Sequence, residues 1–155
     1  NFNSIGIEIS NPGHEYGYKK FNDKQIKTLI RISKNLIKKY KINKKNILGH
    51  SDIAPLRKVD PGEKFPWKRL SKNKIGIWHN IYFKKKKLLK NKKLKFDLNI
   101  FSKNLFKIGY RINFSKSFQL IKLIKIFQMR FRPEKVDGKL DLECFMIAKS
   151  LKNLM

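Results

Sequence analysis

The chain has few of the residues that build disulfides and cysteine-rich metal sites. Its 155 residues include one cysteine and three histidines. The single Cys144 excludes an intrachain disulfide and a zinc site made from several thiolates. Because Cys144 stands beside Phe145 and Met146 in a helical pattern, we predict that it is a small buried hydrophobic residue.

Long apolar runs are also missing. No run approaches the roughly 18–20 residues that a membrane-spanning helix needs, and no signal peptide is visible. The sequence opens at Asn1 and passes directly into a strand-like run, which indicates that it begins inside a longer protein. We therefore expect any targeting segment or membrane anchor to lie upstream. A monomer is the default expectation.

Negative charge is scarce beside positive charge. The chain has 38 Lys and Arg against 11 Asp and Glu, a formal net charge of +27. Such an excess is typical of proteins with a polyanionic partner. Here the lysines are scattered and accompany many Asn and Ile, which favours the compositional bias of an AT-rich genome. The clearest cluster, four lysines at 84–87, falls in a predicted linker, and no nucleic-acid-binding motif is present. We expect no nucleic-acid partner.

The first half of the chain has the pattern of an α/β unit. Residues 4–10 alternate isoleucine with small or polar residues, which predicts a strand. A helical pattern follows, with Asn22 or Asp23 as its cap, and the apolar run 46–49 suits a second buried strand. This order predicts an α/β fold, a mixed sheet flanked by helices, for a domain at residues 1–79.

The second half has the pattern of a small helical domain. Residues 80–98 are rich in lysine and weakly patterned, as in a linker. Three helices are predicted beyond it, at 99–109, 115–131 and 141–154. Pro133 ends the second helix, and Asp137-Gly138 makes a turn before the third. These helices predict a compact three-helix domain over residues 99–155.

The loop at residues 49–62 concentrates the chemically active side chains. It follows the second predicted strand, and prolines stiffen it. His50 and Asp60 offer one nitrogen and one oxygen, which suit zinc. Two ligands alone are a weak motif, so a surface loop with a helix-capping Asp and an ordinary His is the alternative.

Glu8 is a second candidate. A carboxylate in an apolar strand costs several kcal/mol if it is buried without a partner. Glu8 is therefore either paired with a cation or functional, and its position leaves both open. If the two predicted strands are neighbours, Glu8 and His50 face the same cleft.

Several segments of the chain resemble a known enzyme family. The matching segments are residues 4–9 followed by Asn11, residues 49–62, and Phe65-Pro66-Trp67. They resemble the AmiD-type N-acetylmuramoyl-L-alanine amidases, in the wider family that includes phage T7 lysozyme and the peptidoglycan recognition proteins. The helical half is similar to the three-helix peptidoglycan-binding domain of that subgroup, at residues 109–110, 127–133 and 137–143.

The resemblance implies zinc-dependent hydrolysis of the amide bond between N-acetylmuramic acid and L-alanine in peptidoglycan or muropeptides. It implies that His50 and Asp60 ligate Zn²⁺, that Glu8 takes a proton from the attacking water, and that Lys58 holds the oxyanion. It places residues 1–79 in the C-terminal part of the catalytic domain. It also implies a location in the cell envelope, periplasmic or as an outer-membrane lipoprotein.

The sequence departs from the family in one respect. The family's other zinc histidine lies on a strand upstream of Glu8, so we expect the chain to be truncated at its N-terminus. His14 and His79 do not stand at matching positions, and we expect them to be ordinary surface or packing residues. Because a catalytic zinc site uses three protein ligands, a catalytically inactive peptidoglycan-binding fragment is the alternative function.

Overall fold

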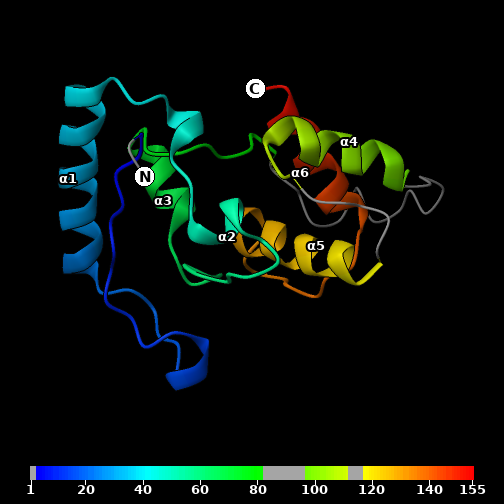
Figure 1. The fold of residues 1–155 in the computed structure, drawn as a ribbon, viewed down its shortest axis with the longest axis horizontal. Helices are drawn as coiled ribbons and strands as arrows, with labels where there is room; N and C mark the ends of the chain where they lie inside the picture. The colour runs from blue at the N-terminus through cyan, green and yellow to red at the C-terminus, as the bar shows by residue number, and fades with distance from the viewer. Residues whose placement is uncertain (1–2, 82–96, 112–116) are drawn as a thin grey trace.

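The computed structural model describes residues 3–81, 97–111 and 117–155. Within them the chain is built from α-helices and 3-10 helices joined by long loops. In Figure 1, α4, α5 and α6 gather at one side of the molecule, α1 lies at the other, and α2 and α3 lie between them. The elements in chain order are η1 (His14–Tyr16), α1 (Asp23–Tyr40), η2 (Lys44–Asn46), α2 (His50–Ile53), α3 (Trp67–Lys72), α4 (Leu98–Ile108), α5 (Ser117–Phe131) and α6 (Leu142–Lys152).

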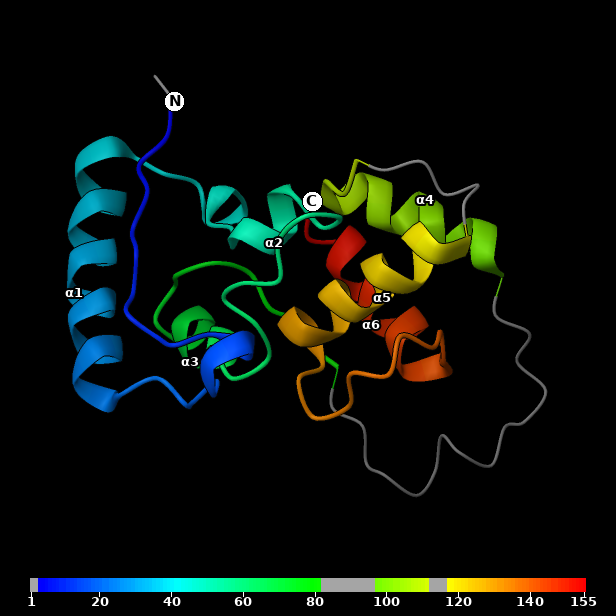
Figure 2. The same ribbon diagram turned by 60° about the horizontal axis from the view of Figure 1, so that its bottom comes forward.

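The predicted α/β fold with a mixed sheet is wrong, because the described residues contain no strand. Residues 4–10 instead run alongside α1 in both views (Figure 1, Figure 2). The side chains of Ile5 and Ile7 are 50% and 42% exposed, and Ile9 alone of the three packs against a core. The alternation alone does not make a strand, because a sheet also needs a neighbouring strand to satisfy its amides and carbonyls.

The second predicted strand, at 46–49, also fails for a visible reason. No backbone hydrogen bond joins these residues to 4–10 among those that the structure describes. Leu48 is exposed, and the carbonyl of Ile47 accepts a hydrogen bond from the Arg130 guanidinium at 3.0 Å. A side chain thus occupies the carbonyl that a neighbouring strand would use.

The prediction that a helix starts at Asn22 is confirmed by α1. The Asn22 side chain accepts from the amide of Lys24 at 2.8 Å, and the Gln25 side chain accepts from the Asn22 amide at 3.0 Å. This reciprocal cap satisfies donors that a helix start leaves free. One face of α1 then buries Ile26 and Leu29.

The buried side chains form two clusters. The first joins α1 to α3 and the segment after it, through Ile26, Leu29, Phe65, Trp67, Leu70 and Ile75. The second joins α4, α5 and α6, through Ile77, Phe101, Leu105, Tyr110, Leu123, Ile124, Ile126, Phe127, Phe131, Cys144, Ile147, Ala148 and Leu151. Trp78 packs against both. Cys144 is fully buried as predicted, and burial raises the pKa of its thiol to about 11.

The three helices of the second half match the predicted ones closely. α5 ends at Phe131, two residues before Pro133, as a helix must when proline blocks its continuation. The predicted turn follows, held by the buried Gln128, whose side-chain oxygen accepts from the amides of Asp137 and Gly138 at 3.0 and 2.8 Å. The order of these three helices was therefore readable from the sequence.

Part of the predicted domain division lies outside the described residues. Residues 82–96 are outside the described part of the chain. They include the four lysines at 84–87 and most of the predicted linker at 80–98. The boundaries at 79 and 99 stay predictions. In the part of the chain that the structure covers, no helix is long and apolar enough to cross a membrane.

Two phenylalanines on α5 test the packing of the second cluster. Phe127 is fully buried and Phe118 is 73% exposed. We expect Phe127→Ala to lower the free energy of unfolding by about 3–5 kcal/mol, because it removes buried surface and leaves a cavity. Phe118→Ala is the control, with an expected change within about 0.5 kcal/mol. Urea unfolding followed by circular dichroism measures both, and equal effects would contradict this packing.

Candidate active site

The loop at 49–62 begins with the single turn of α2. Asp52 accepts a hydrogen bond from the amide of Gly49 at 2.7 Å, which caps the turn, and the amide of Ala54 donates to the His50 carbonyl at 2.9 Å. The loop then returns to its start, because the amide of Ser51 donates to the Asp60 carbonyl at 2.9 Å. Residues nine positions apart are thereby placed side by side.

This return brings together the two predicted zinc ligands. His50 Nδ1 lies 2.9 Å from Asp60 Oδ2, where the imidazole donates to the carboxylate. The two side chains are 60% and 57% exposed, so their other polar atoms are open to solvent. The pair is an accessible nitrogen and oxygen on one short loop.

The pair consists of residue types that zinc accepts as ligands. The 2.9 Å between His50 Nδ1 and Asp60 Oδ2 is an ordinary hydrogen-bond distance. The residues that the structure describes contain no group of three or more His, Cys, Asp or Glu side chains suited to a metal. The roles of His50 and Asp60 as zinc ligands stay predictions, and the described residues bring no third such side chain to the pair.

Glu8, in the segment before α1, and Lys58, in the loop itself, are both exposed. In the described residues, no hydrogen bond or ion pair joins either side chain to His50 or Asp60. The amide of Lys58 donates to the Ala54 carbonyl at 2.9 Å, which fixes its backbone but leaves its side chain exposed. The two strands that would have placed Glu8 and His50 in one cleft are not formed, so the roles of Glu8 and Lys58 stay predictions.

The end of the loop is clamped by an aromatic residue that the sequence did not single out. The Tyr18 hydroxyl donates to the Pro61 carbonyl at 2.5 Å and accepts from the Lys64 amide at 3.0 Å. Burial raises the pKa of Tyr18 to about 12, and the Glu63 carboxylate adds to the rise, although the Lys64 amide lowers it. The phenol therefore stays protonated and keeps donating at neutral pH.

The two remaining histidines have structural partners. His14 Nε2 lies 3.0 Å from Glu63 Oε2, and its ring centre is 4.2 Å from that of Tyr18. His79 Nε2 donates to the Phe131 carbonyl at 3.0 Å, and burial lowers the pKa of its imidazole. His14 thus braces the end of the loop, and His79 ties the segment after α3 to α5.

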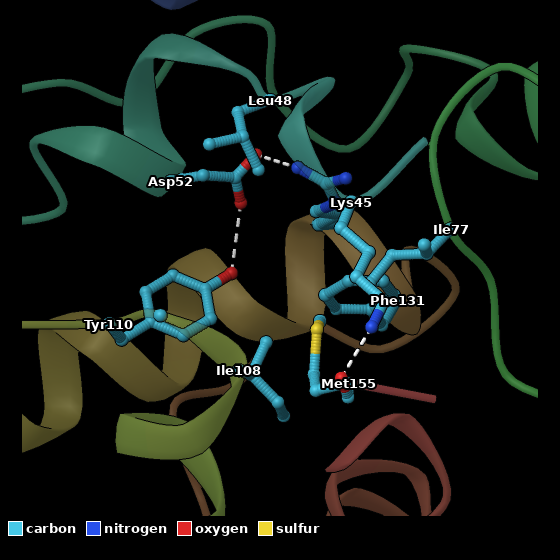
Figure 3. Close-up of a pocket in the computed structure, with 10 residues that line it drawn as sticks. Lys45, Leu48, Asp52, Ile77, Ile108, Tyr110, Phe131 and Met155 are labelled. Atoms are coloured by element: carbon cyan, nitrogen blue, oxygen red, sulfur yellow. Dashed lines mark hydrogen bonds and ion pairs between the residues drawn. The ribbon is translucent and has the colours of Figure 1, made fainter. Parts of the chain in front are cut away.

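Asp52 connects the loop to α4, α5 and α6, which together form the helical half of the molecule. Its carboxylate accepts from the Tyr110 hydroxyl at 2.9 Å and pairs with the Arg130 guanidinium. Figure 3 shows Tyr110 facing Asp52 across a small cavity. Nothing in the sequence singles out Asp52, because its partners are 58 and 78 positions away.

A groove of about 260 Å³ adjoins the same loop. Val59, which stands between Lys58 and Asp60, lines one side, and α5 lines the other with Phe118 and Ile121. Two lysines of α5, Lys122 and Lys125, also line this groove. The arrangement offers apolar contacts and positive charge directly beside the candidate site.

The part of the chain that contains this loop is similar to a known family. Residues 1–63 match the family model described as N-acetylmuramoyl-L-alanine amidase. The matched stretch contains the His50–Asp60 pair together with Glu8 and Lys58. The candidate site therefore lies within the stretch that is similar to this amidase family.

The relationship extends over the rest of the chain. This chain is 33% identical over 162 residues to the N-acetylmuramoyl-L-alanine amidase AmiD of Escherichia coli. The match covers 97% of this chain and 57% of that protein. The match to the 1,6-anhydro-N-acetylmuramyl-L-alanine amidase AmpD of Enterobacter cloacae is 42% identical over 66 residues, 43% of this chain and 33% of that protein. The chain is an AmiD homologue that spans about half the length of that relative.

Two solved structures of amidases are similar to this chain in three dimensions. The crystal structure of AmpDh3 from Pseudomonas aeruginosa superposes with a TM-score of 0.78 and 32% identity, covering 89% of this chain and 56% of that one. Escherichia coli AmiD, in a complex with anhydro-N-acetylmuramic acid-L-Ala-D-γ-Glu-L-Lys, superposes with a TM-score of 0.76 and 31% identity, covering 89% and 55%.

Removal of one hydroxyl tests the clamp at the end of the loop. We expect Tyr18→Phe to lower the free energy of unfolding by about 1–2 kcal/mol at pH 7, because the Lys64 amide loses its acceptor. Tyr16→Phe, at an exposed tyrosine two residues away, is the control and should have no effect. Urea unfolding of both variants measures the difference, and equal stabilities would refute the clamp.

The stability of the unchanged protein and of Tyr18→Phe can also be compared as a function of pH. The folded pKa of Tyr18, about 12, lies above its ordinary value of 10.0. Its protonated form therefore contributes stability that is complete below pH 10 and is lost as the pH rises through about 12. We expect the stability difference between the unchanged protein and Tyr18→Phe to narrow from pH 9 to pH 11. A constant difference would show that Tyr18 titrates alike in both states.

Proposed function

We propose that the protein hydrolyses the amide bond between N-acetylmuramic acid and L-alanine, in peptidoglycan or muropeptides, in a zinc-dependent reaction. The observation that carries the proposal is the exposed His50–Asp60 pair, with 2.9 Å between its nitrogen and oxygen, inside the segment that matches the amidase family. The related AmiD and AmpDh3 structures hold an anhydro-muramyl peptide and an anhydromuramic pentapeptide, and we extend that substrate class to this chain.

His50 and Asp60 would hold the zinc ion. When bound there, Zn²⁺ supplies Lewis-acid polarisation of a carbonyl and makes a water acidic enough to react near neutral pH. Glu8 accepts a proton from the attacking water and returns it to the amine of L-alanine as the C–N bond breaks. The Lys58 ammonium stabilises the negative charge that develops on the carbonyl oxygen. The products are the lactyl carboxylate of the sugar and the free stem peptide.

A second candidate function is binding of wall fragments without hydrolysis. It is favoured by the number of metal donors, because only two are brought together in the described residues. The apolar and cationic groove beside Val59 would then be a contact surface for the muropeptide. With either function we propose a monomer located in the cell envelope.

The first test is release of stem peptide from a purified anhydro-muropeptide, followed by mass spectrometry. We expect release with added Zn²⁺ and none with a chelator. His50→Ala and Asp60→Asn should abolish it, because each removes a ligand. Asp23→Asn is the matched control for Asp60, since Asp23 is equally exposed but lies at the start of α1. Retention of the muropeptide without release would support the binding function instead.

A second experiment separates the two catalytic roles. Glu8→Gln should lower kcat by about 10²–10⁴-fold, the usual contribution of a general base. Lys58→Met should lower kcat by about 10²–10³-fold, as loss of an oxyanion donor does. Glu134→Gln and Lys72→Met, at exposed positions outside the loop, should keep full activity. A change in KM alone would show that Glu8 or Lys58 only binds substrate.

A further inference from the structure

The helical half of the molecule holds the candidate site through one residue of α2. Asp52 belongs to the same helical turn as His50 and also caps the amide of Gly49. Its carboxylate accepts hydrogen bonds from the Tyr110 hydroxyl and the Arg130 guanidinium. Tyr110 lies just after α4, and Arg130 lies near the end of α5. The loop that carries the predicted zinc ligands is therefore attached to the helical half at its first turn.

This attachment is buried, unlike the His50–Asp60 pair. The Asp52 and Arg130 side chains are 6% and 4% exposed. A buried carboxylate that loses its cation is strongly unfavourable, so the two groups fix each other's position. Burial and the nearby Asp52 charge raise the pKa of Tyr110 well above its usual value, which keeps its hydroxyl a donor.

Arg130 is itself held on two sides. Its Nη2 donates to the Ile47 carbonyl at 3.0 Å, and its guanidinium carbon lies 4.2 Å from the centre of the Trp67 ring. One side chain thus contacts the segment before α2, α2 itself and the start of α3. A planar guanidinium can do this because it offers several donors and a flat face at once.

Two lysines extend the attachment at the edges of the loop. Lys122 of α5 donates to the Leu56 carbonyl at 2.7 Å. Lys45 donates to the Met155 carbonyl, and this bond is drawn in Figure 3. The helical half therefore contacts the segment from 45 to 56 at several points, with Asp52 at the buried centre.

We infer that Arg130 and Tyr110 are positioning residues for the site: through Asp52 they set the orientation of α2, and hence of His50 toward Asp60. A helix of one turn has almost no stability of its own, so its direction must come from tertiary contacts. The role of His50 as a ligand rests on the proposed function. The attachment of the loop to the helices does not.

Arg132 provides a matched control two residues further along the chain. It is fully buried, and its Nη1 donates to both oxygens of Asp141, at 2.7 and 2.5 Å. Its other ion pairs are with Asp137 and Glu143, all in the helical half. Arg132→Met therefore removes a buried arginine from the same region without touching α2.

The experiment measures hydrogen exchange of the loop in the whole chain, at a temperature where each variant stays folded. We expect Arg130→Met to speed exchange of the Ser51 and Ala54 amides at least tenfold, because both depend on the placement of α2. Arg130→Lys should restore part of the protection. Arg132→Met should speed exchange around the turn at 137–141 and leave Ser51 unchanged.

Tyr110→Phe is the milder variant. It removes one hydrogen bond and keeps the ion pair, so we expect a smaller increase in exchange confined to α2. If Arg130→Met and Tyr110→Phe leave the Ser51 amide as slow as in the unchanged protein, the positioning role is overturned. Equal loop exchange in Arg130→Met and Arg132→Met would overturn it too, because both would then act through general destabilisation.

Zinc affinity provides a second readout, by competition with a chromophoric chelator. We expect Arg130→Met to weaken Zn²⁺ binding at least tenfold and Arg132→Met to leave it unchanged. If loop exchange responds as described but the unchanged protein binds no zinc, the zinc site of the proposed function fails while the attachment of the loop stands. If zinc binds equally tightly to Arg130→Met, Arg130 does not position His50.

Discussion

A single buried carboxylate, that of Asp52, determines how the two halves of the molecule meet. Removed from water, it has to be matched by a cation and a donor, and Arg130 and Tyr110 supply them from elements 78 and 58 positions away. Because the same carboxylate caps Gly49, the direction of α2 is coupled to the packing of α5. Such a contact specifies an arrangement more sharply than apolar packing, since displaced charges have no second partner.

The candidate site depends on this contact although it does not include it. His50 and Asp60 are open to solvent, and two hydrogen bonds hold the loop around them: the Ser51 amide donates to the Asp60 carbonyl, and the Tyr18 hydroxyl donates to the Pro61 carbonyl. The exposed pair can thus be reached by a large substrate while its surroundings stay fixed. The two halves also depend on each other in sequence. A protein that combined the loop with a different helical half would have to supply matching donors to Asp52.

The helices were predictable from the sequence. The lack of a sheet in the described residues was not. Asn22 and Gln25 cap α1 by contacts three residues apart, and Pro133 stops α5 by local sterics, so neighbouring residues contain the information. The alternation of Ile5 and Ile7 carries no information about a partner strand, and they are half exposed. The pairing of Asp52 with Arg130 is equally invisible, because it joins distant residues that each look ordinary locally. For the site, the sequence placed His50 and Asp60 on one loop, but only the backbone bond from Ser51 to Asp60 shows why their side chains meet.

Gly62 shows how a residue without chemistry can be indispensable here. Its φ of 75° is in the region that favours glycine, and an added Cβ would lie 2.7 Å from both His14 Cε1 and the Tyr18 hydroxyl. Every other amino acid would push apart the side chains that brace the end of the site loop. In a saturation mutagenesis screen scored by activity, we expect substitutions of Gly62 to be poorly tolerated, although glycine has no side chain to take part in the chemistry. Mutational sensitivity in this loop therefore reports space as much as catalysis.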